Sequence, residues 1–231
     1  MIKKVLGKTI ASAATAGVLI APMALASSPA LMNVACADNP NETTVSVRLE
    51  HDAAAYGTKN VATATLSAIP AGVREDVKIE VVAQNGDTGN VIQGVRVNRN
   101  GVARKLLPRG LQADDTYSIR AQYHSCAWSP AVTYSVSKAQ SDPQPVVRNA
   151  RKAKFRTTVL GSGDLDAKVG PVSFVVKKRG AGLVADRDTR LIDGVARVNM
   201  TDLKPGRYVL KVRYKGNVNF EAGVSKRRFR V

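Results

Sequence analysis

One β-rich unit is written twice in this sequence, and that duplication constrains the fold more than any other feature. The tetrapeptide Gly-Val-Ala-Arg occurs at Gly101–Arg104 and again at Gly194–Arg197, a period of about 90 residues. Each copy is followed by a strand-like run that begins and ends in tyrosine, Tyr117–Tyr123 and Tyr208–Tyr214. Self-similarity at a fixed period is the signature of tandem modules. We therefore expect two consecutive domains, each the size of a small β-sandwich.

The pattern within each copy predicts an all-β fold of two tandem immunoglobulin-like β-sandwiches. Short runs of alternating polar and apolar residues, separated by turn residues, are typical of sandwich strands. The first domain should contain strands at Thr43–Leu49, Val61–Leu66, Val77–Ala83, Val91–Val97, Gly101–Leu107, Tyr117–Tyr123 and Ala131–Val136. The second should contain strands at Phe155–Leu160, Val172–Lys177, Arg190–Ile192, Val195–Met200, Arg207–Lys215 and Val224–Val231.

The N-terminal segment has the pattern of a cleaved signal peptide, residues 1–26. Lys3, Lys4 and Lys8 precede the mostly apolar run Thr9–Met23, and small residues follow at Ala24–Ala26. This order of basic, apolar and small residues predicts export. The apolar run is shorter than the roughly 20 residues that span a bilayer, so we expect no transmembrane anchor. The protein should be secreted or extracellular, with association with the cell wall left open.

The expected boundaries divide the remaining chain into four parts. Residues 27–41 form a lead-in, 42–138 the first domain, 139–145 a linker and 146–231 the second domain. Pro143 and Pro145 should stiffen the linker toward an extended conformation.

The two cysteines, Cys36 and Cys126, are expected to form a disulfide. Exported chains favour disulfides. In an immunoglobulin-like sandwich the N-terminus and the F–G loop lie at the same end, which would bring the pair together. Cleavage after Ala26 would retain Cys36, whereas cleavage after Ala37 would remove it.

Several motifs of the second domain resemble a known family. They are Gly170-Pro171-Val172-Ser173-Phe174, Gly194-Val195-Ala196, Leu203-Lys204-Pro205-Gly206-Arg207-Tyr208 and Tyr214-Lys215-Gly216-Asn217-Val218-Asn219-Phe220. This set is similar to the bacterial Ig-like domain repeats of secreted and surface proteins, and the first domain fits more loosely. The resemblance implies an adhesion, spacer or binding role without catalysis. Tyr208 would make a tyrosine corner or pack as an ordinary core residue.

Positive charge is concentrated in the second domain. Residues 41–140 contain 11 Lys and Arg against 9 Asp and Glu, whereas residues 141–231 contain 21 against 8. The formal excess is therefore +2 in the first part and +13 in the second. An asymmetry of this kind suggests an anionic partner.

Strand alternation should gather many of these charges on one sheet face. Successive side chains on a strand point to opposite faces, and strands C, F and G adjoin in this fold. The expected basic face comprises Lys177, Arg207, Lys211, Arg213, Lys215, Lys226, Arg228 and Arg230. It could bind an anionic wall polymer, an acidic glycan or a membrane surface. The alternative is a solvated face that keeps the protein soluble.

No pattern in the sequence indicates catalysis. Only two histidines occur, His51 and His124, and no nucleophile elbow, zinc-protease or phosphate-loop motif is present. We expect no enzyme, cofactor or metal site, and we interpret Asp186 and Asp188 as a charged turn rather than calcium ligands. Trp128 is expected in the F–G loop, as a contact for a second partner or as a cap on the core.

Two other functional classes remain open. One is an exported enzyme inhibitor, or an enzyme with an unrecognised site. The other is a nucleic-acid-binding protein, which is disfavoured because Tyr208, Tyr214 and Phe229 alternate to the inside and leave no stacking platforms. The sequence does not predict the oligomeric state.

Overall fold

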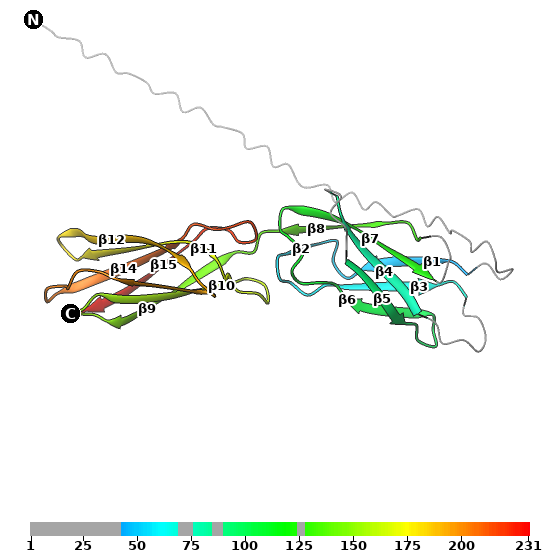
Figure 1. Cartoon of the computed structure of the whole chain (residues 1–231), viewed down its shortest axis with the longest axis horizontal. Helices are drawn as coiled ribbons and strands as arrows, with labels where there is room; N and C mark the ends of the chain where they lie inside the picture. The colour runs from blue at the N-terminus through cyan, green and yellow to red at the C-terminus, as the bar shows by residue number, and fades with distance from the viewer. Residues whose placement is uncertain (1–42, 69–75, 85–89, 124–127) are drawn as a thin grey trace, which may run out of the picture. The chain divides into compact units, whose positions relative to one another are not determined.

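The computed structural model describes residues 43–68, 76–84, 90–123 and 128–231, and this part of the chain is all-β, with no helix (Figure 1). Its strands form four sheets, two in each domain. The buried apolar residues fall into two clusters, one in each domain. Two immunoglobulin-like β-sandwiches are therefore present, as the sequence predicts.

The first domain packs a three-stranded sheet on a five-stranded one. The smaller sheet has the order β1-β3-β6 and the larger one the order β2-β8-β7-β4-β5. The strands are β1 (Val45–Leu49), β2 (Ala53–Ala55), β3 (Val61–Leu66), β4 (Asp76–Ala83), β5 (Asn90–Arg96), β6 (Val102–Leu106), β7 (Asp115–Tyr123) and β8 (Val132–Ser137). Alternate residues of β4 and β7 are buried, including Ile79 and Ile119 at 0% exposure, and these side chains fill the space between the sheets.

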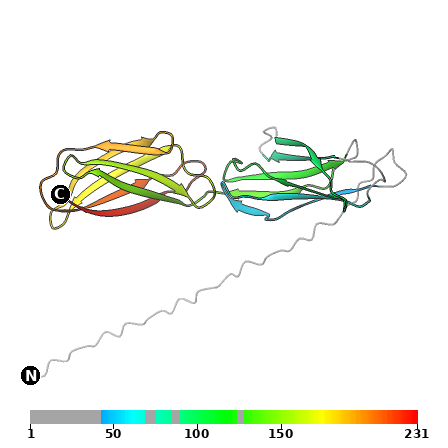
Figure 2. The ribbon, with the colours of Figure 1, turned by 90° about the horizontal axis from the view of Figure 1, so that it is seen from below.

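The second domain repeats this plan with longer strands (Figure 2). One sheet has the order β13-β10-β9 and the other the order β12-β11-β14-β15. The strands are β9 (Ser141–Asn149), β10 (Lys154–Gly161), β11 (Gly170–Lys178), β12 (Gly182–Leu191), β13 (Val195–Asn199), β14 (Arg207–Tyr214) and β15 (Gly223–Arg230). Phe155, Phe174, Leu210 and Val212 are fully or almost fully buried between the sheets.

Most of the predicted linker lies in strand β9. Residues 141–145 pair with β10, and Pro143 and Pro145 lie opposite Val159 and Thr157. Proline lacks the backbone N–H and is tolerated on an edge strand, where one side of the backbone needs no partner. β9 is such an edge in the order β13-β10-β9. The two prolines therefore mark an edge strand of the second domain rather than a spacer.

Two other strands differ from the prediction. β12 runs over ten residues, Gly182–Leu191, and includes Asp186 and Asp188, which we expected in a turn. It is a mostly exposed edge strand, so charged residues on both faces hide the usual alternation. β2 consists of three alanines, which have weak strand propensity, and it forms by parallel pairing with β8.

Some predictions fall outside the described residues. The signal peptide, residues 1–26, the lead-in, residues 27–41, and both cysteines, Cys36 and Cys126, belong to these parts of the chain. Within the described residues, no helix is long and apolar enough to cross a membrane.

A tyrosine corner occurs in both domains. The Tyr208 hydroxyl donates a hydrogen bond to the Lys204 carbonyl at 2.7 Å, and the Tyr117 hydroxyl donates one to the Gln112 carbonyl at 3.2 Å. Both rings are buried. Each corner ties the start of a central strand, β14 or β7, to the loop before it, as in other sandwich folds.

We predict that Tyr208→Phe lowers the free energy of unfolding of the second domain by about 1 kcal/mol, because the Lys204 carbonyl loses its donor while the ring stays packed. Chemical denaturation of the full chain would measure this change. Tyr117→Phe is the matched variant and should weaken the first domain. An unchanged denaturation midpoint for Tyr208→Phe would mean that packing of the ring, and not the hydrogen bond of its hydroxyl, stabilises the domain.

The second domain should also lose stability at high pH because of Tyr214. Burial raises the pKa of this phenol to about 12, against ~10 in an unfolded chain. Its contribution is complete below pH ~10 and is lost as the pH rises toward ~12. Denaturation across this range should show a falling free energy of unfolding, with a smaller slope in Tyr214→Phe. The same slope in both proteins would contradict this assignment.

Candidate interaction surface

Core burial fixes which residues of β14 point outward. Tyr208, Leu210, Val212 and Tyr214 are buried on the inner side of the sheet, with at most 3% exposure. Because side chains alternate, Arg207, Lys211 and Arg213 must point to the outer side. The basic residues therefore reach solvent as a direct consequence of the apolar residues filling the core.

Strand register brings the outward cations of β14 and β15 opposite one another. Arg207 pairs with Arg230, Lys211 pairs with Lys226, and Arg228 lies opposite Val209. On the other side of β14, Lys177 of β11 also lies opposite Val209. Directly opposed residues on neighbouring strands share a face.

Lys215 continues the β14 row. Its backbone N–H donates to the Pro171 carbonyl at 2.9 Å, and its ammonium pairs with Asp188 of β12 at 2.9 Å. All eight residues of the predicted basic face therefore lie on the outer side of β11, β14 and β15. We use the term basic face for this set: Lys177, Arg207, Lys211, Arg213, Lys215, Lys226, Arg228 and Arg230.

One end of the basic face is hollowed into a groove of about 1160 Å³. Six members of the face line it: Lys177, Arg207, Lys211, Lys226, Arg228 and Arg230. Lys178 and Arg179, which strand alternation does not assign to the face, line it as well, together with Tyr208, Val209 and Phe229. Arg179 follows β11, and its backbone N–H donates to the Arg207 carbonyl at 2.9 Å. The run of three cations Lys177-Lys178-Arg179 in the sequence could have predicted this. Strand alternation assigns only Lys177 to the face.

The basic face is crowded with like charges. The pKa of Lys211 is lowered, first by loss of hydration and then by the charges of Arg213, Lys226 and Lys177. Within the described residues, Lys215 is the only member of the face paired with a carboxylate. Its ammonium donates a hydrogen bond to Asp188 and lowers the pKa of that carboxyl. The other seven cations are therefore available to a partner.

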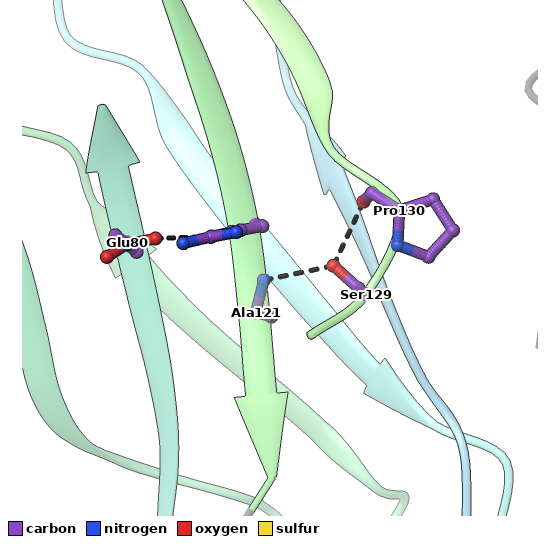
Figure 3. Close-up of polar contacts among 5 residues, drawn as sticks. Glu80, Ala121, Ser129 and Pro130 are labelled. Atoms are coloured by element: carbon purple, nitrogen blue, oxygen red, sulfur yellow. Dashed lines mark hydrogen bonds and ion pairs between the residues drawn. The ribbon is translucent and has the colours of Figure 1, made fainter. Parts of the chain in front are cut away.

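Trp128 lies on the outer side of the larger sheet of the first domain. The Arg120 guanidinium is 4.6 Å from the centre of the Trp128 ring and also pairs with Glu80 of β4. Next to it, the Ala121 N–H donates to Ser129 Oγ at 3.0 Å, and this hydroxyl donates to the Pro130 carbonyl at 3.0 Å (Figure 3). These contacts hold the half-buried Trp128 against Arg120. Its role as a contact for a partner stays a prediction.

Groups of three or more metal-ligating side chains do not occur among the residues that the structure describes. His51 is exposed there, and His124 lies outside the described residues. Asp186 and Asp188 occupy outward positions of β12, opposite Val175 and Ser173. They flank the basic face on one side.

Comparisons with known proteins find solved structures of low similarity and no matching family. No family model and no curated protein matches the chain. Among solved structures, a tetra-tandem repeat from the extending region of a large adhesion protein is 16% identical, with a TM-score of 0.44, and covers 82% of this chain and 49% of its own. The Yersinia pseudotuberculosis adhesin InvE is 18% identical, with a TM-score of 0.37, and the match covers 81% of this chain and 59% of the adhesin. The BSP domain of a biofilm associated protein is 16% identical, with a TM-score of 0.28, and the match covers 81% of this chain and 29% of that structure.

The chain thus spans between 29% and 59% of the length of these three structures. Their identities lie below 20% and their TM-scores below 0.5. Similarity at this level carries no argument about function.

We predict that the pKa of Lys211 rises toward its ordinary value when a neighbouring cation is removed. Lys226→Gln and Arg213→Gln each take away a repelling charge. Titration of the lysine side-chain NMR signals would measure the change. Arg151→Gln, on an exposed loop residue that is not part of the basic face, is the control and should leave the pKa unchanged. Equal pKa values in all three variants would contradict the described crowding.

Proposed function

We propose that this chain is a secreted, non-catalytic interaction module that binds an anionic extracellular partner through the basic face. The observation that carries this proposal is the set of seven cations on one sheet face without a carboxylate partner among the described residues. A concentrated positive potential attracts polyanions and raises their local concentration.

The position of the cations favours binding over protection of a sheet edge alone. Lysine and arginine on an edge strand can block edge-to-edge aggregation. That explanation fits Lys226, Arg228 and Arg230, because β15 is an edge strand. It does not fit Lys177 and Lys211, because β11 and β14 are central strands.

Crowding on this face costs stability that an anion would restore. Like charges directly opposite each other on paired strands are destabilising, and the Arg207–Arg230 and Lys211–Lys226 pairs are of this kind. A bound anion would neutralise both members of each pair. The basic face thus has the properties of a site that is stabilised by its ligand.

The sequence of residues 1–26 and the resemblance to bacterial Ig-like repeats support an extracellular location. An anionic wall polymer, an acidic glycan and an anionic membrane surface are the partners to be expected there. Nucleic acid is disfavoured because the Tyr208 and Phe229 rings stack on each other, 5.5 Å apart, and Phe229 also packs on Phe155. Both rings line the groove, but they are already engaged with each other and with Phe155, which disfavours stacking on bases.

The first domain differs from the second in its outward residues. At the outer positions of β4 and β7, Glu80 pairs with Arg120, so charges compensate each other there. We propose that this domain serves as a spacer or presents Trp128 to a second partner.

The triple variant Lys226→Gln, Arg228→Gln and Arg230→Gln should bind heparin, a generic polyanion, on the order of 100-fold more weakly at low salt. Each lost cation is worth about 1 kcal/mol next to an anionic surface. Binding by the unmodified chain should fall steeply as salt rises. Isothermal titration calorimetry over a range of salt concentrations would measure both effects.

The matched control is Arg151→Gln, Lys154→Gln and Arg197→Gln. These residues are also exposed cations of the second domain, but they belong to the other sheet or its loops. The control should retain most of the affinity. Equal losses in both triple variants, or binding that survives high salt, would exclude the basic face as the binding surface.

A further inference from the structure

On the outer side of the sheet, an outward residue of β14 and the β15 residue opposite it form one rung. Five successive rungs, the last of them Lys215 alone, each contain at least one cation. By register, the first rung holds Arg207 and Arg230, the second Arg228, the third Lys211 and Lys226, and the fourth Arg213. Lys215, directly after β14, is the fifth. Lys177 of β11 adds a second cation to the second rung, opposite Val209. We call these five rungs the cation ladder.

The spacing of the ladder is set by backbone geometry. Outward side chains on one antiparallel strand repeat every second residue, about 6.8 Å apart. Two residues of extended chain contain six backbone bonds and span about 6.6–7.2 Å. A linear polymer that places one negative charge after every six single bonds therefore has nearly the same repeat as the ladder.

A phosphodiester of a three-carbon polyol has this repeat. Six bonds separate successive phosphorus atoms: P–O, O–C, two C–C, C–O and O–P. Phosphate oxygens also match the forked donors of arginine, which bind them in pairs. Arg207, Arg228 and Arg230 supply such donors in the groove, beside Arg179.

We propose, on the basis of the function proposed above, that the ligand is a linear poly(glycerol phosphate) that lies along the cation ladder. Its phosphates are bound one per rung at the first four rungs, since Lys215 of the fifth is paired with Asp188. Its polyol segments cross Val209 and Val224, the two uncharged outward positions of β14 and β15.

Neighbouring residues define the path of the polymer. Asp186 and Asp188 occupy outward positions of β12, opposite Val175 and Ser173 of β11. Their charges repel a polyanion, so the path follows β14 and β15 and does not cross toward β12. Single-stranded nucleic acid has the same six-bond repeat, but its bases need aromatic platforms. No outward position of β14 or β15 carries an aromatic residue, and the two rings that line the groove, Tyr208 and Phe229, stack on each other.

The test compares two polymers that share the phosphodiester and differ in the length of the polyol between phosphates. Oligomers of glycerol phosphate and of ribitol phosphate carry the same phosphodiester, but ribitol has five carbons and places eight bonds between phosphates. At equal phosphate number, the full chain should bind the glycerol oligomer about tenfold more tightly, which corresponds to one or two additional rungs in contact. Affinity should rise with oligomer length up to about four phosphates and then level off, because four rungs carry cations without a carboxylate partner among the described residues, whereas Lys215 of the fifth rung is paired with Asp188.

A gain-of-charge variant tests the register directly. Val224→Lys would complete the fourth rung, at a position that is 55% exposed, and should raise the affinity for the glycerol oligomer about fivefold. The control, Val218→Lys, adds the same charge at a loop position that is 52% exposed and outside the ladder. It should give a smaller gain.

The outcomes separate this inference from the proposed function. Equal affinity for glycerol and ribitol oligomers, or equal gains in affinity from the two lysine variants, would contradict the proposed match in spacing. Neither result would contradict polyanion binding by the basic face. Tighter binding of oligo(dT) than of the glycerol oligomer would show that the ligand is nucleic acid rather than poly(glycerol phosphate). No binding of heparin or of any of these oligomers would overturn both proposals.

Discussion

The buried side of β14 is the constraint on which the surface of the second domain depends. Tyr208, Leu210, Val212 and Tyr214 must all face the core, and a shift of one residue would turn every one of them to solvent. This requirement fixes which residues of β14 face outward, and the register of β14 with β11 and β15 agrees with it. The same register then sets cation opposite cation on the outer side. Burial of apolar side chains thus stabilises an arrangement that the charges alone would oppose.

The two domains show how one fold can carry different surfaces. The inner positions of their central strands are similar, and both domains close the start of a central strand with a tyrosine corner. The outer positions differ, because the first domain pairs Glu80 with Arg120 while the second opposes Lys211 to Lys226. The two domains therefore share the pattern of buried residues on their central strands and differ in the residues that point outward. The residues that form the core and the residues that reach solvent alternate along the same strands.

Strand periodicity was sufficient to predict the all-β class, most strands and the shared face of the eight cations. It was not sufficient for β9 or β12, because edge strands bury little and their sequences lack clean alternation. Two prolines in β9 looked like a linker, and four charges in β12 looked like a turn. The pairing of particular cations, the groove and the contribution of Arg179 depend on register between strands, which a single sequence does not contain.

We propose that the outer side of β11, β14 and β15 binds a polyanion along the strands. Chemical-shift mapping by NMR, with glycerol phosphate oligomers added to the full chain, tests it most directly. Our account predicts that the largest changes occur at outward residues of β14 and β15, with smaller changes at Lys177 and Arg179 and none in the β13-β10-β9 sheet. Changes centred on that sheet, on the first domain, or spread evenly over all exposed lysines and arginines would contradict it.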